Sequence, residues 1–269
     1  MRSRLKDKIA IVTGGQSGLG RQIALRFGKE GANVVIPDLV LEGAQKVAQE
    51  IEKMGRKSLA MRTDVSKPID VKEMVEKTID GFGRVDILVN NAAILIREGI
   101  LDHTEEDWNK VLAVNLTGVF LCTKEVVPYM IRQGGGKIIN IASIGGLLGN
   151  AHPSYAASKG GVINLTRGLA LELAPENINI NCISPGEFRT GINEYLFQAD
   201  PTLEVRLART APARRLGRPE EIASAAVFLG SDESDFCHGT NLVVDGGSIC
   251  GVPGARVSRP GVPNPFERE

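Results

Sequence analysis

The stretch TGGQSGLG, residues 13–20, decides how the chain is expected to fold, because it joins an apolar run to an amphipathic one. The run before it, KIAIVT, has the composition of a buried strand, and the run after it carries apolar residues at helical spacings of three and four. Its glycines permit positive φ and let a phosphate approach the backbone closely. The expected helix offers unpaired N–H groups and the positive end of its dipole. The stretch therefore predicts a strand, a loop that could hold a pyrophosphate, and a helix.

The same alternation of short apolar runs and longer amphipathic segments continues along the chain. Near-continuous apolar strands between helices predict a parallel sheet that helices cover on both faces. One pattern throughout predicts a single α/β domain over residues 1–250. The predicted strands are residues 8–13, 32–37, 57–62, 85–90, 137–142, 178–181 and 241–245, and the clearest predicted helices are 18–31, 44–54 and 71–83.

The end of the chain, GVPGARVSRPGVPNPFERE at residues 251–269, follows neither pattern. It carries four prolines and has no helical or strand periodicity. Two interpretations stay open for this Pro-rich tail: a disordered segment, or an ordered arm laid across a partner subunit.

Composition excludes several classes of protein. The chain has 269 residues, and its 32 basic and 32 acidic residues cancel, so nothing indicates a nucleic-acid or acidic-surface binder. Four scattered cysteines without CxxC spacing argue against a disulfide framework and for a reducing compartment. The three histidines, 103, 152 and 238, lack metal-ligand spacing, so no metal is expected. The apolar run near the N-terminus is too short for a signal peptide or membrane span, so we expect a soluble cytoplasmic protein.

Asp38 ends the second predicted strand, 18 residues after Gly20. A dinucleotide-binding fold places there the carboxylate that bonds the ribose hydroxyls. That carboxylate would repel a 2′-phosphate, so NAD is favoured over NADP. The alternative is a solvated acid at a strand end. Asp64 and Val65 end the third predicted strand, where an adenine ring could rest.

The stretch YAASK places Tyr155 and Lys159 four residues apart, on one face of a helix. A phenol with a pKa near 10 is a poor base, and lowering that pKa by about 3 units takes roughly 4 kcal/mol. An ammonium about 4 Å from the phenol oxygen supplies on the order of 4 kcal/mol at an effective dielectric constant of 20. The pair therefore predicts a composite acid–base group. The alternative is a surface tyrosine beside a solvated lysine.

Six motifs in this order resemble the classical short-chain dehydrogenase/reductases over residues 5–249. Besides TGGQSGLG and the Tyr155–Lys159 pair, these are NNAA at 90–93 (with Ala93 for the usual glycine), Asn115, Ser143, and PGEFRT at 185–190. The resemblance implies a Rossmann-like, doubly wound sheet of strand order 3-2-1-4-5-6-7, assembled as a homotetramer. It also implies an NAD(P)-dependent oxidoreductase that acts on a secondary alcohol or ketone. A general likeness to bacterial glucose and gluconate dehydrogenases suggests a sugar or polyol.

The resemblance also implies roles for single residues. Tyr155 is the expected acid–base, Lys159 its electrostatic partner, and Ser143 the donor that holds the substrate oxygen. Asn115 would interrupt a helix and bind a water that relays protons to the lysine. The predicted cofactor-binding residues are Gly14, Gln16, Ser17, Gly18, Leu19, Gly20, Asp38, Leu39, Asp64, Val65, Asn90, Asn91, Ala92, Ala93, Tyr155, Lys159, Pro185, Gly186, Phe188 and Thr190.

Substrate contacts are expected from variable segments of the chain. These are Leu95 and Ile96, the loop 144–153 with Ser143 and His152, Glu187, and the region 191–212 with Asn193. For His152, a surface loop position is the alternative.

Two rival functions stay open. One is a 3-oxoacyl thioester (acyl-carrier-protein) reductase, whose relatives usually prefer NADPH and carry a basic residue in the glycine loop; Gln16, Ser17 and Asp38 argue against it. The other is a non-catalytic NAD-binding sensor or scaffold on the same fold. Binding alone needs no tyrosine base, so the complete set of catalytic motifs argues against that interpretation.

Overall fold

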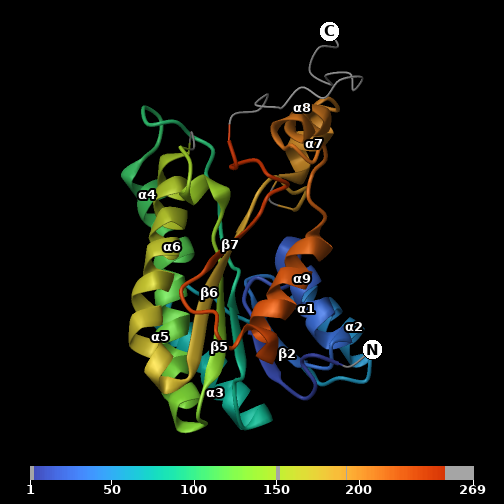
Figure 1. Ribbon diagram of the computed structural model, residues 1–269, viewed down its shortest axis with the longest axis vertical. Coiled ribbons are helices and arrows are strands. Elements are labelled where there is room, and N and C mark those ends of the chain that lie inside the picture. Colours follow the sequence, from blue (N-terminus) through green and yellow to red (C-terminus); the bar gives the residue numbers. More distant parts are fainter. Residues whose placement is uncertain (1–2, 150–151, 192, 252–269) are drawn as a thin grey trace.

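The computed structural model describes residues 3–149, 152–191 and 193–251. Its centre is a seven-stranded parallel sheet of order β3-β2-β1-β4-β5-β6-β7, which confirms the strand order that the resemblance implied (Figure 1). The Pro-rich tail lies outside the described residues except for Gly251. The strands are β1 Ile9–Val12, β2 Asn33–Asp38, β3 Ser58–Arg62, β4 Ile87–Asn90, β5 Gly136–Ile141, β6 Ile178–Pro185 and β7 Asn241–Val244.

Helices cover both faces of the sheet, as predicted. Figure 1 shows α1, α2 and α9 on one side of the strands and α3 to α6 on the other, with α7 and α8 beyond one end of the sheet. The helices are α1 Gly18–Lys29, α2 Leu41–Glu52, α3 Pro68–Phe82, α4 Glu105–Leu112, α5 Gly118–Arg132, α6 Pro153–Leu173, α7 Glu194–Ala199, α8 Leu203–Thr210 and α9 Pro219–Gly230.

Two apolar cores lie on the two faces, and alternation along β1 shows how one strand serves both. Ala10 and Val12 pack into the core beneath α1, α2 and α9. Ile11, between them, packs into the core beneath α3, α5 and α6. All three side chains are fully buried, because successive residues of a strand point to opposite faces. This double burial explains why the strands are apolar throughout rather than at every second residue.

Strand β6 is longer than the sequence predicted. The expected strand was 178–181, whereas the observed one continues to Pro185. Its second half pairs with β7, from Cys182 opposite Asn241 to Pro185 opposite Val244. The Ser-Pro pair resembles a turn in sequence, yet here it closes a fully buried strand. The longer strand carries the PGEFRT segment to the same end of the sheet as the glycine loop.

One helical run, Glu105–Arg132, is long and apolar enough to cross a membrane by length and composition alone. It consists of α4, a π-helical segment at Ala113–Thr117, and α5. Cys122, Val126 and Met130 of α5 are buried in the core against the sheet. The run thus serves as part of the helical layer over β4 and β5.

Candidate active site

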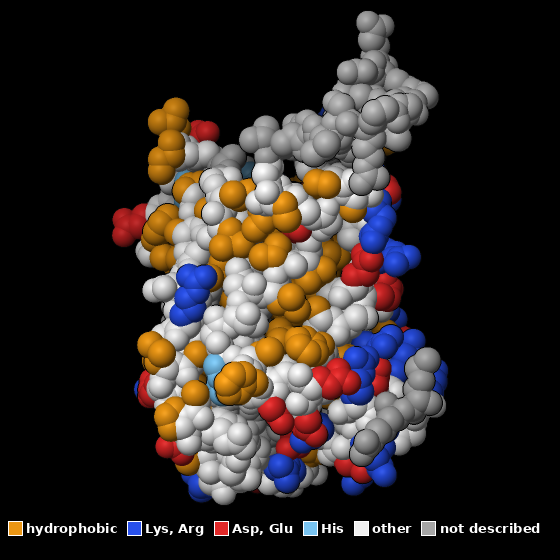
Figure 2. Space-filling view, in the orientation of Figure 1, with side chains coloured by type: hydrophobic (Ala, Val, Ile, Leu, Met, Phe, Trp, Pro, Cys, Tyr) orange, Lys and Arg blue, Asp and Glu red, His pale blue; other side chains and the backbone are white. Residues whose placement is uncertain are grey.

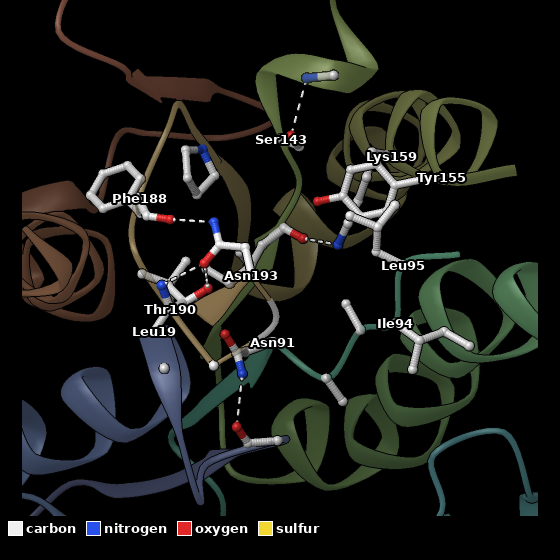
Figure 3. A pocket seen from close by; sticks show the side chains of 18 of the residues that line it. Leu19, Asn91, Ile94, Leu95, Ser143, Tyr155, Lys159, Phe188, Thr190 and Asn193 are labelled. Carbon is white, nitrogen blue, oxygen red and sulfur yellow. Dashed lines mark hydrogen bonds between the residues drawn. The ribbon is translucent and has the colours of Figure 1, made fainter. Parts of the chain in front are cut away.

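A cavity of about 770 Å³ opens at the carboxyl ends of the strands. Its lining comes from the loops after β1 to β6, the start of α6, and α7 with α8. Figure 3 shows side chains from these separate parts of the sequence converging on one space. In open parallel sheets this edge is where ligands bind.

The glycine loop forms one wall of this cavity. Gly14 and Gly18 have φ of +64° and +54°, a region that glycine adopts without strain. A Cβ on Gly20 would lie 2.4 Å from both the Asn91 amide nitrogen and the Gly14 carbonyl, so that position tolerates no side chain. Helix α1 begins at Gly18, and the Ser17 side chain makes no capping hydrogen bond to its first turn. The first-turn N–H groups therefore face the loop without a side-chain cap, which suits an anionic group.

Asp38 stands at the end of β2 and is nearly buried. Its Oδ2 accepts a hydrogen bond from the Gln16 backbone N–H at 3.1 Å, and its Oδ1 accepts one from Val40 N–H at 3.0 Å. The carboxylate thus ties the glycine loop to β2 while it lines the cavity. Asp64 also lines the cavity and accepts hydrogen bonds from the N–H and hydroxyl of Ser66.

Asn90 requires a correction, because the structure does not place it at the predicted cofactor contact. It is 3% exposed and does not line the cavity. Its amide donates to Asn140 Oδ1 at 2.8 Å and to Thr123 Oγ1 at 3.2 Å. The neighbouring Asn91 lines the cavity instead, and its amide donates to the Thr13 and Gly14 carbonyls. Asn90 therefore holds β4 to β5 beneath the site.

Tyr155 and Lys159 lie on one face of α6 and both line the cavity. Lys159 is 3% exposed, and its ammonium donates to the Ile141 carbonyl at 2.8 Å. Its Nζ lies 5.7 Å from the centre of the Tyr155 ring. Figure 3 shows the phenol oxygen pointing into the cavity and the ammonium directed toward the strand. The pair is therefore part of the cavity wall and not a solvated surface pair.

The pKa of Tyr155 differs from the expectation that the lysine would lower it. Burial raises this pKa above its ordinary value of 10, and the negative charge of Glu187 adds to the rise. The Ser143 hydroxyl and the positive charge of Arg97 act in the opposite direction. Burial also lowers the pKa of Lys159 to about 8. Burial is the largest cause of both pKa changes, and it keeps the phenol protonated.

Ser143 lies two residues after the end of β5, and its side chain is beside Tyr155. Its Oγ accepts a hydrogen bond from the Gly145 N–H at 3.0 Å, at the start of a short 3₁₀ turn. The turn role and the catalytic role are compatible, because a hydroxyl that accepts one bond still carries a proton to donate.

Asn115 lies in the π-helical segment, so the predicted helix interruption is present. Its side chain is fully buried. Its Oδ1 accepts from Ile94 N–H, and its Nδ2 donates to the Ile94 carbonyl and to Ser158 Oγ. Both side-chain donors are thus used to hold the wall at Ile94. A water that relays protons at Asn115 would therefore have to donate a hydrogen bond to an oxygen atom of this residue.

The predicted substrate residues Leu95, Ser143, His152, Glu187 and Asn193 all line the cavity, whereas Ile96 does not. Asn193 was expected to contact the substrate, and its side chain also has partners within the protein. Its Oδ1 accepts from Thr190 N–H and its Nδ2 donates to the Phe188 carbonyl, both at 2.8 Å, so it braces the loop. Burial lowers the pKa of His152, and the positive charge of Arg97 lowers it further.

Of the predicted cofactor residues, all except Gly20 and Asn90 line the cavity. The sequence analysis missed Arg97, which lies two residues beyond Leu95. Position alone could have identified it, since it follows the NNAA segment by only a few residues. Leu196, Phe197, Leu203 and Leu207 also line the cavity, and they belong to the predicted substrate region 191–212. Further lining residues outside the predicted segments are Pro37, Thr63, Ile94, Val114, Ile141 and Ala142.

Comparisons with known proteins agree with this geometry. A family model described as "Enoyl-(Acyl carrier protein) reductase" matches residues 14–248. The 3-oxoacyl-(acyl-carrier-protein) reductase of Thermotoga maritima is 41% identical, with 91% of this chain and 99% of that protein covered. A short-chain type dehydrogenase/reductase from Mycobacterium marinum is 35% identical with a TM-score of 0.88, over 93% and 98% of the two chains. A putative 2-deoxy-D-gluconate 3-dehydrogenase from Agrobacterium tumefaciens, solved with bound NADP, is 37% identical with a TM-score of 0.85, over 93% and 99%.

The buried Lys159 predicts a pH dependence of stability. Its pKa is about 8 in the folded protein against 10.5 as the ordinary value. Between these values the unfolded chain binds more protons, so stability rises with pH in that window. Below pH 8 the full cost of burying the charge is present. In Lys159→Met this contribution is absent. The free energy of unfolding of the wild type should therefore rise by roughly 1–3 kcal/mol relative to that of the variant between pH 7.5 and 10.5. Urea unfolding of both proteins at several pH values measures this change. A difference in unfolding free energy that stays constant with pH would contradict the lowered pKa of Lys159.

Proposed function

Because this chain belongs to the classical short-chain dehydrogenase/reductase family, we propose that it transfers a hydride between NAD and a secondary alcohol or ketone. The observation that carries the proposal is the meeting of Ser143, Tyr155 and Lys159 in the cavity that the glycine loop borders. A binding protein would need the loop but no phenol aimed into the cavity.

The residues present fit a dinucleotide. The glycine loop and the uncapped first turn of α1 would hold the pyrophosphate, and Asp38 would accept hydrogen bonds from ribose hydroxyls. Asn91, Ala92 and Thr190 line the path from the loop to Tyr155. When bound, the nicotinamide supplies or accepts the hydride, which no side chain of the protein can do.

Tyr155 acts as the proton donor or acceptor at the substrate oxygen. With its pKa raised by burial, the phenol is protonated at neutral pH and is ready to donate when a ketone is reduced. Oxidation of an alcohol requires the phenolate form of Tyr155. Positive charge from outside the protein must therefore stabilise this phenolate. Ser143 donates to the same substrate oxygen and stabilises negative charge there. Lys159, with a pKa of about 8, can supply a proton to Tyr155 near neutral pH after the phenol has donated its own.

The substrate end of the cavity favours a polar molecule such as a sugar or polyol. Glu187 and Arg97 border it together with His152. The Agrobacterium relative is named for a deoxy sugar acid, which agrees with this assignment.

A thioester reductase remains the second candidate, and two observations favour it. The Thermotoga relative carries that name at 41% identity. In addition, Leu148, Leu196, Phe197, Leu203 and Leu207 give the cavity an apolar side that suits an acyl chain. Initial rates with a 3-oxoacyl thioester and with a panel of sugars and polyols, each with both cofactors, separate the two candidates.

Tyr155→Phe should reduce turnover by about 10²- to 10⁴-fold, because it removes the proton that moves to or from the substrate oxygen. The dissociation constant of the cofactor should change little. Steady-state rates and a cofactor titration measure the two effects. Tyr129→Phe on α5, outside the cavity lining, is the matched control. Turnover near the wild-type rate in Tyr155→Phe would place the acid–base elsewhere.

Asp38→Ala should weaken NAD binding more than NADP binding, because the carboxylate bonds ribose hydroxyls and repels a 2′-phosphate. We expect the ratio of the two dissociation constants to shift by about tenfold or more. Asp80→Ala, an exposed acid on α3, serves as the control. An unchanged ratio would show that Asp38 only ties the loop through Gln16 and Val40.

We also propose a homotetramer, as the family likeness implies. Figure 2 shows charged side chains gathered near α1, α2 and α9, while the surface over α4, α6 and β7 is mostly apolar or uncharged. Leu171 on α6 and Phe236 before β7 are 84% and 102% exposed, and such large apolar side chains suit a subunit interface.

Leu171→Glu should shift the assembly toward smaller species, because it buries a charge if α6 packs against a second subunit. Sedimentation velocity over a range of concentrations measures the change. Ile69→Glu on α3, where the side chain is 77% exposed, is the control and should leave the assembly intact. A Leu171→Glu tetramer as stable as the wild type would remove α6 from the interface.

A further inference from the structure

Five charged residues line the cavity within the described part of the chain: Asp38, Asp64, Lys159, Arg97 and Glu187. The first two follow β2 and β3, at the end assigned to the nucleotide. Lys159 is buried and bonded to a strand carbonyl. Arg97 and Glu187 remain: both border the substrate end, and neither has yet been assigned a particular group of the substrate.

Both of these residues act on the reacting phenol. The positive charge of Arg97 lowers the pKa of Tyr155, and the negative charge of Glu187 raises it. Arg97 also opposes the rise that burial causes in the pKa of Glu187. Both side chains also line the cavity into which the Tyr155 phenol points. A substrate in this cavity can therefore face all three groups.

Arg97 lines the cavity and is held there by a contact with α7. It belongs to the segment after β4, and its Nη1 donates to the hydroxyl of Tyr195 on α7 at 3.3 Å. The guanidinium carbon lies 5.6 Å from the centre of the Tyr195 ring. These contacts orient a planar group that can donate two parallel hydrogen bonds to a carboxylate.

Glu187 has the opposite character. It follows Pro185-Gly186 at the end of β6, where its backbone carbonyl accepts from Gly217 N–H at 2.9 Å. That bond fixes the backbone, while the carboxyl group lines the cavity half-buried. A carboxyl group in this setting accepts hydrogen bonds from hydroxyl groups.

We propose that Arg97 and Glu187 are specificity residues for a polyhydroxy acid, in which Arg97 binds the carboxylate and Glu187 accepts a hydrogen bond from a hydroxyl. The assignment rests on the proposed alcohol–ketone oxidoreductase function and narrows its substrate class. A neutral polyol offers hydroxyl groups to Glu187 but no negative charge to Arg97. An anion without hydroxyls would satisfy Arg97 and be repelled by Glu187. A polyhydroxy acid matches both groups.

The experiment uses D-gluconate and D-sorbitol, which share six carbons and differ at one terminal carbon, a carboxylate in the first and an alcohol in the second. Their dissociation constants are measured by calorimetry on the full chain with saturating NAD, at a pH where gluconate is ionised. In the wild type we expect gluconate to bind at least about tenfold more tightly than sorbitol. Arg97→Gln should abolish this ratio, and Arg97→Lys should restore part of it because the charge returns.

Arg189→Gln is the matched control, since Arg189 lies on the neighbouring segment, pairs with Glu194, and does not line the cavity. It should leave the ratio unchanged. Glu187→Gln keeps the shape of the side chain and removes the charge, so it should weaken both probes when hydroxyl binding dominates. The pH profile gives a second readout, because Arg97→Gln should raise the kinetic pKa of Tyr155 and Glu187→Gln should lower it.

The proposal is overturned if neither probe binds, if the wild type does not distinguish them, or if Arg97→Gln changes both affinities by the same factor. Turnover separates this result from the parent function. Oxidation of neutral alcohols with NAD and no preference for the acid would leave the oxidoreductase in place and remove the polyhydroxy acid. Selective gluconate binding without turnover of any alcohol would support the polyhydroxy acid and remove the oxidoreductase function.

Discussion

The buried ammonium of Lys159 is the constraint on which the site depends. A cation that is 3% exposed must be hydrogen-bonded, and here the Ile141 carbonyl at the end of β5 accepts that bond. The bond fixes the start of α6 against the end of β5. Tyr155, one turn earlier on the helix, then faces the cavity, and Ser143, two residues after Ile141, comes to lie beside it. The three proposed catalytic side chains are thus placed by one contact between a helix and a strand.

Sequence patterns predicted the sheet and most of the cavity lining, because both follow from local rules. Apolar runs identify strands, and parallel strands bring all their carboxyl ends to one edge, so residues after each strand were expected to meet there. Asn90 escaped this reasoning because its side chain points into the interior, where its amide donates to Asn140 and Thr123. Strand β6 was too short in the prediction because its second half is defined by pairing with β7, which lies far along the chain.

The electrostatics of the site could not be predicted from spacing alone. Four residues between Tyr155 and Lys159 predict a shared face but not the depth of burial, and burial decides the sign of the pKa change for the phenol. The position of Arg97 after β4 could have placed it near the site, but not its effect on the phenol, since a lone arginine after a strand is usually a solvated residue. Its orientation depends on α7, where the exposed Tyr195 accepts a hydrogen bond from Arg97.

The π-helical segment at Ala113–Thr117 separates two helices that must satisfy different neighbours. Each residue of an α-helix turns the chain by about 100°, so one additional residue in a turn re-aims everything that follows. Helix α4 can therefore face α6 while α5 faces the sheet, although the two form one unbroken rod. Within this rod a change of one residue in length would act as a rotation rather than as a shift. Insertions and deletions in surface loops elsewhere cost little stability. The rotation of this helix about its axis, in contrast, is fixed by the cavity wall that Asn115 anchors.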